Sequence, residues 1–111
     1  RKDVDATVVR AAGQIYQTQP DGRLSNLYSI KLANKTRKDL PITLKVENMD
    51  GDIAVVGTAL HVGPESYLQT PFFVKIDPGQ IARRKTKIMI GVYQGHKRIT
   101  TAETTFMGPG N

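Results

Sequence analysis

The stretch GRLSNLYSIKLANKT, residues 22–36, alternates between apolar and polar side chains through its middle. Tyr28, Ile30 and Leu32 fall on one side of a two-residue period, and the residues between them are polar. Such a period is typical of a β-strand that buries one face and leaves the other in water. We therefore expect a half-buried strand here, with its apolar face in a core.

Two asparagines, Asn26 and Asn34, bracket this apolar face. Both lie beside predicted loops, because Asp21-Gly22 has the chemistry of a turn and the polar run 35–39 follows Asn34. An amide at the end of a strand can bond to loop backbone that the strand ladder leaves unpaired. We expect Asn26 and Asn34 to clamp the strand ends by hydrogen bonding to backbone atoms, and to bind no ligand.

Turn signals containing glycine, proline, asparagine or aspartate recur along the chain, with short segments rich in β-branched and aromatic residues between them. No segment shows a sustained helical period. The strands that we expect are Thr7–Arg10 with Gln14–Thr18, Leu24–Ala33, Leu40–Glu47, Ile53–Val56, Ala59–Val62, Tyr67–Ile76, Thr86–Tyr93 and Arg98–Phe106. Alternating strands at this spacing predict an all-β fold, an immunoglobulin-like antiparallel β-sandwich of about seven strands. The length, 111 residues, suits a single domain over 1–111.

The composition excludes several kinds of chemistry. The chain has no cysteine, which removes thiol catalysis, iron–sulfur ligation and cysteine-based zinc sites. No apolar run approaches the roughly 20 residues of a membrane span. Neither His61 nor His96 lies in a context that suggests a catalytic triad or a metal site. We therefore predict no catalytic, cofactor-binding or metal-binding residue, no small-molecule substrate, and a domain that is not an enzyme.

The net charge is +6, and the basic residues fall into clusters. In an immunoglobulin-type order, the chain start, the loop 34–40 and the hairpin 94–97 share one end of the sandwich. That end, the basic pole, would gather Arg1, Lys2, Lys35, Arg37, Lys38, Lys97 and Arg98. Such a surface can face a membrane or a partner, or it can be an ordinary solvated face. Nucleic-acid binding is not expected, because most aromatic residues fall on predicted core positions.

The first 36 residues resemble a known family. The residues that carry the resemblance are Asp3-Val4, Val9-Arg10, Tyr16, Asp21-Gly22, Ser25-Asn26-Leu27-Tyr28, Leu32 and Asn34-Lys35-Thr36. Together they resemble the C-terminal domain of the FixG/CcoG proteins, which are membrane-bound accessory proteins for cytochrome oxidase assembly. The resemblance is looser over Leu40–Glu47 and weak beyond it.

The resemblance implies a larger membrane protein of which this chain is the C-terminal part. Two [4Fe–4S] clusters are then expected in the N-terminal part, and none in this chain. The parent protein would serve assembly of the cbb3-type oxidase and copper handling, with this domain on the periplasmic side of the bacterial inner membrane. Its partners would be a protein in the membrane or periplasm and an anionic lipid surface. The alternative that the residues leave open is an envelope adhesion or carbohydrate-associated β-sandwich module.

Overall fold

Most of the chain forms β-strands in the computed structural model, which describes residues 3–13, 15–57 and 59–110. The strands are β1 (Val4–Arg10), β2 (Gln17–Thr18), β3 (Leu24–Asn34), β4 (Leu40–Val46), β5 (Asp52–Val55), β6 (Leu60–Val62), β7 (Ser66–Ile76), β8 (Lys85–Gln94) and β9 (Lys97–Met107). One short 3-10 helix, η1 (Pro78–Gln80), joins β7 to β8. No helix in the described ranges is long and apolar enough to cross a membrane.

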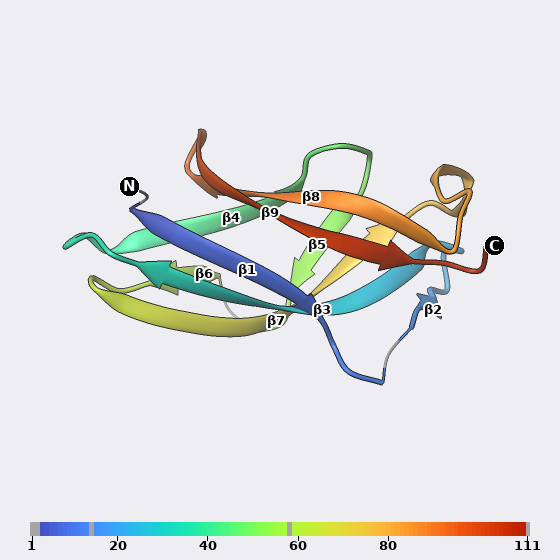
Figure 1. Ribbon diagram of the computed structural model, residues 1–111, viewed down its shortest axis with the longest axis horizontal. Helices are drawn as coiled ribbons and strands as arrows, with labels where there is room; N and C mark the ends of the chain where they lie inside the picture. The colour runs from blue at the N-terminus through green and yellow to red at the C-terminus, as the bar shows by residue number, and fades with distance from the viewer. Residues whose placement is uncertain (1–2, 14, 58, 111) are drawn as a thin grey trace.

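The strands form two antiparallel sheets that pack face to face (Figure 1). One sheet has the order β1-β3-β7-β5, with the short β2 also paired to β3. The other has the order β6-β4-β8-β9. The strand of the opening stretch, β3, lies between β1 and β7 and pairs with β7 along its whole length. The predicted all-β, immunoglobulin-like sandwich is confirmed.

The predicted strands are present, with different bounds at several ends. The first begins at Val4 rather than at Thr7, because Val4–Ala6 extends the pairing with β3 as far as Asn34. Gly13, with φ of 78°, lies between β1 and β2, and the predicted piece Gln14–Thr18 is a strand only over Gln17–Thr18; Gln14 lies outside the described residues. Counting the short pieces separately gives more strands than the seven expected.

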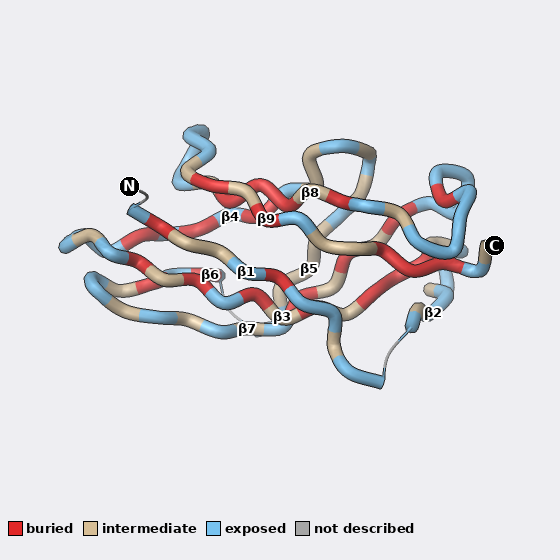
Figure 2. The backbone as a smooth tube through the Cα atoms, in the orientation of Figure 1, coloured by how far each residue is buried: buried red, intermediate tan, exposed pale blue. Residues whose placement is uncertain are grey.

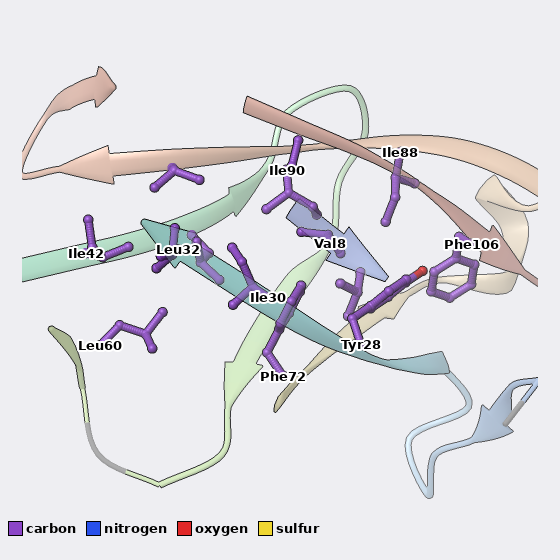
Figure 3. Packing of buried hydrophobic residues seen from close by; sticks show 14 of the residues in the cluster. Val8, Tyr28, Ile30, Leu32, Ile42, Leu60, Phe72, Ile88, Ile90 and Phe106 are labelled. Carbon is purple, nitrogen blue, oxygen red and sulfur yellow. The ribbon is translucent and has the colours of Figure 1, made fainter. Parts of the chain in front are cut away.

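The core lies between the sheets and follows the two-residue period (Figure 2). Tyr28, Ile30 and Leu32 have no exposed surface, and the Tyr28 ring stacks on Phe72 with 5.4 Å between centroids (Figure 3). Side chains from β8 and β9 close the core from the second sheet, among them Ile88, Ile90 and Phe106 (Figure 3). Removing these apolar side chains from water is the main stabilising contribution to such a fold.

The hairpin between β8 and β9 turns over Gly95 and His96, and Gln94 pairs with Lys97 across it. Gly95 has φ of 61°, a left-handed conformation that a two-residue hairpin loop requires and that glycine adopts without strain. The tight turn places Lys97 and Arg98 at the start of β9, at the same end of the molecule as the loop between β3 and β4 (Figure 1).

Candidate interaction surface at the basic end

Five of the basic residues predicted to share one pole line a single open hollow of about 760 Å³. Lys35, Arg37 and Lys38 come from the loop between β3 and β4, and Lys97 and Arg98 come from the start of β9. The lining contains one acid, Asp3, from the segment before β1. Arg1 and Lys2 lie outside the described residues. The structure thus brings the five cations together, and their role as a contact surface stays a prediction.

Asn34 builds the loop that carries three of these cations. It is only 2% exposed, and its Nδ2 donates to the carbonyl oxygens of Lys38 at 2.7 Å and Gly63 at 2.9 Å. Its Oδ1 accepts from the Thr36 amide at 2.9 Å and from the Thr36 hydroxyl at 2.7 Å. One side chain therefore fixes both ends of the loop and ties it to the turn after β6. The prediction that Asn34 clamps loop backbone is confirmed.

Asn26 makes the corresponding clamp at the other end of β3. Its Nδ2 donates to the Met107 carbonyl at 2.9 Å, and its Oδ1 accepts from the Met107 amide at 2.8 Å. Next to it, the Tyr28 hydroxyl donates to the Thr105 carbonyl at 2.8 Å. These bonds join the central strand of one sheet to β9 of the other, so Asn26 bonds backbone as predicted, but across the sandwich rather than to a loop.

Ion pairs divide the cations of the basic pole into two groups. Lys35 pairs with Asp5 at 2.7 Å, and Arg98 pairs with Glu47 at 2.9 Å. For Arg37, Lys38 and Lys97, by contrast, no ion pair is formed within the described part of the chain. All three are exposed. These three cations therefore reach the solvent without a carboxylate of the described residues bound to them.

A small network holds Arg98 in place. The Tyr93 hydroxyl donates to Glu47 Oε2 at 2.6 Å, and Arg98 donates to the same oxygen. These two bonds, that of Tyr93 first, lower the pKa of the Glu47 carboxyl below its ordinary value. Gly91 makes room for the network, because a Cβ atom there would lie 2.7 Å from the Glu47 carboxyl carbon. Sequence reasoning missed this network, since its members are 46 and 51 residues apart.

A second basic cluster, Arg83, Arg84 and Lys85, lies at the opposite end of the sandwich, where β8 begins (Figure 1). Its residues are exposed and line no part of the 760 Å³ hollow. The chain therefore carries two basic clusters at separate places, and one can serve as a control for the other.

Groups that could carry catalysis or hold a metal are scattered. Within residues 3–13, 15–57 and 59–110, no three histidine, aspartate or glutamate side chains gather as a metal site would need. His61 pairs with Asp39, both at the surface, and His96 lies in the β8–β9 turn. The chain contains no cysteine.

The sheet order and the buried face of β3 define an immunoglobulin-like domain, and comparison with known proteins agrees. The family model described as "IG-like fold at C-terminal of FixG, putative oxidoreductase" matches residues 1–109. The chain belongs to this family, which confirms the resemblance seen in its first 36 residues.

A solved structure with the same fold is the "Crystal structure of FixG-related protein from Vibrio parahaemolyticus". Its TM-score is 0.74 at 22% sequence identity, over 96% of this chain and 97% of that one. At this identity the likeness concerns the fold. A search of curated proteins finds no match.

Proposed function

We propose that this chain is the non-catalytic interaction domain of a membrane-bound iron–sulfur protein of the FixG/CcoG kind. The parent protein assists assembly of the cbb3-type cytochrome oxidase and copper handling. Its C-terminal domain stands on the periplasmic side of the bacterial inner membrane, with the basic pole toward the membrane. Its partner is a protein in the membrane or periplasm.

Family membership supports the connection to FixG, and the distribution of charge supports the orientation. Residues from two separate parts of the chain, the β3–β4 loop and the start of β9, place five cations around one hollow at a single end of the sandwich. Anionic head groups attract such a cluster within about a Debye length of the surface. The gathered cations are the observation that carries the proposal.

A non-catalytic role agrees with the chemistry of the side chains. An active site would need an acid, a base or a nucleophile within hydrogen-bond reach of one another in a cleft. The charged side chains that line the hollow at the basic pole are five cations and one carboxylate, Asp3, and the hydroxyl of Thr36 in the same lining donates to the amide oxygen of Asn34. Such a lining attracts and orients anions and offers no nucleophile with an adjacent base.

The experiment is made in the full-length parent protein, in cells that depend on the cbb3-type oxidase. One variant lacks residues 1–111, and a second carries Lys35→Glu, Arg37→Glu and Lys38→Glu. The matched control carries Arg83→Glu, Arg84→Glu and Lys85→Glu, with the same change of net charge. We expect both test variants to lower the amount of assembled oxidase, while the control stays near the unmodified level.

The iron–sulfur absorbance of the purified parent separates the role of the domain from general damage. We expect that absorbance to be retained in all variants, because the chain itself has no cysteine with which to hold a cluster. Unchanged oxidase levels after removal of residues 1–111 would overturn the proposal. Protease added to spheroplasts tests the location, and resistance of the domain there would place it on the other side.

A further inference from the structure

We infer that the hollow of the basic pole is a binding site for the phosphate group of an anionic phospholipid, rather than only part of a diffusely charged surface. The inference rests on the proposed function for the presence of a nearby membrane. It adds a defined site, with Arg37, Lys38 and Lys97 as the groups that contact the phosphate.

The ion pairs leave an excess of positive charge around the hollow. Within the lining of the hollow, the three cations that form no ion pair in the described chain come from two elements, the β3–β4 loop and β9. The other two cations of the lining, Lys35 and Arg98, are paired with Asp5 and Glu47. Positive charge that no carboxylate of the described chain balances therefore faces the hollow, where a phosphate oxygen can accept charge-assisted hydrogen bonds.

The β3–β4 loop, which carries Arg37 and Lys38, is preorganised. Asn34 bonds the carbonyl of Lys38 and the amide of Thr36, so the backbone between them is fixed before any ligand arrives. The Thr36 carbonyl also accepts from the Glu65 amide at 2.9 Å, which joins the loop to the start of β7. A fixed loop loses less conformational entropy on binding, which favours a site over a diffuse attraction.

An exposed aromatic ring beside the hollow favours a lipid over free phosphate as the source of the anion. Tyr67 is the most exposed of the large hydrophobic residues described, at 75%, and it pairs with Ala33 at the end of β3 that leads into the β3–β4 loop. It lines a second hollow that shares Lys35 with the first, and Lys31 Nζ lies 5.5 Å from its ring centroid. Tyrosine and lysine together are typical of the membrane interface, where the ring sits at the level of the head groups.

The test uses the 111-residue chain and sedimentation with vesicles of phosphatidylglycerol or of phosphatidylcholine. We expect binding to phosphatidylglycerol only. Arg37→Ala with Lys97→Ala should weaken it about 25-fold, the effect of two charges near an anionic surface. The control, Arg83→Ala with Arg84→Ala, removes the same charge and should change binding less than about twofold, since surface attraction falls off within a Debye length.

Two further variants separate a site from diffuse charge. Arg37→Lys keeps the charge and loses the planar fork that binds a phosphate through two parallel bonds, so a built site predicts weaker binding. Tyr67→Ser should weaken vesicle binding without affecting inorganic phosphate. Thermal unfolding of each variant verifies that it is folded.

A titration with inorganic phosphate, followed through the NMR chemical shifts of the backbone amides in the β3–β4 loop, distinguishes free phosphate from a lipid as the source of the anion. Saturable shifts with phosphate and no vesicle binding would overturn the assignment to a lipid. If the Arg83 and Arg84 control weakened vesicle binding equally, or if Arg37→Lys had no effect on it, net charge alone would account for the binding. Either result would overturn the proposed site. These readouts do not involve the oxidase, so the site can fail while the role of the parent protein stands.

Discussion

Replacing Asn26 by alanine should destabilise the domain far more than its small change in volume suggests. Asn26 is 2% exposed and makes two hydrogen bonds with the backbone of Met107, which is itself buried at 5% exposure. In Asn26→Ala both Met107 groups lose their partner where water does not reach. The structure therefore predicts the cost of two unsatisfied buried groups, together with the loss of two bonds.

The expected loss of stability follows from the free-energy cost of leaving a buried polar group unpaired, which is about 1–3 kcal/mol for each group. With some relaxation at the end of β9, we expect Asn26→Ala to lower the free energy of unfolding by about 2–4 kcal/mol. This is a large part of the total stability of a small domain, which is on the order of 5–15 kcal/mol.

Asn48 provides a matched control. Its Nδ2 donates to the Lys87 carbonyl at 3.0 Å and its Oδ1 accepts from the Met89 amide at 3.1 Å, the same pattern of bonds as at Asn26. Asn48 is exposed, however, so water can replace its side chain. We expect Asn48→Ala to cost no more than about 1 kcal/mol.

Urea unfolding, followed by circular dichroism, measures both variants, and an unchanged slope against urea shows that the same surface is exposed on unfolding. Equal losses of stability in Asn26→Ala and Asn48→Ala would refute the reasoning, because the two sites differ in burial and not in the kind of bond.

Three other outcomes can be measured with the same domain. Asn34→Ala should speed amide hydrogen exchange over residues 35–38, because the loop loses its internal bonds; exchange as slow as in the parent chain would contradict this. Gly91→Ala should cost about 1–3 kcal/mol in urea unfolding, since its Cβ would meet the Glu47 carboxyl, and adding Glu47→Ala should recover part of that loss. Because the pKa of Glu47 is lowered in the folded state, this carboxyl adds stability that is present above the ordinary glutamate pKa and is lost as the pH falls through the lowered value. Tyr93→Phe should raise the pKa of Glu47, as measured by titrating the carboxyl with NMR. An unchanged pKa would exclude the Tyr93 hydroxyl as the main cause of the lowering.

The sequence was sufficient to predict the strands, because burial in this fold follows a two-residue period. Phe72, Val74 and Ile76 alternate with less buried neighbours and all have no exposed surface. The first residues of β1 were missed, although Val4-Asp5-Ala6-Thr7-Val8 alternates between apolar and polar side chains; pairing with β3 shows that the strand begins at Val4. The point at which a strand begins depends on the strand beside it, which a short local pattern does not determine.

The sequence did not predict which residues the polar side chains contact. Its pattern places Asn26 at a strand end, but it does not show that the partner is Met107, 81 residues away. Likewise, the sequence predicts a gathering of cations and does not show that Glu47 binds Arg98 while Lys97 is left without an ion pair in the described chain. The first contact depends on how the two sheets are placed against each other, and the second depends on which strands are neighbours within one sheet. No local period encodes either of them.

The two asparagines of β3 also restrict how that strand can misalign during folding. Alternation alone forbids a slip by one residue, since it would turn the apolar face outward. It does not forbid a slip by two, which keeps Tyr28, Ile30 and Leu32 facing inward. Such a slip would move each amide away from the backbone groups that it now bonds and leave it buried without a partner. Asn26 and Asn34 therefore select one register among those that hydrophobicity permits.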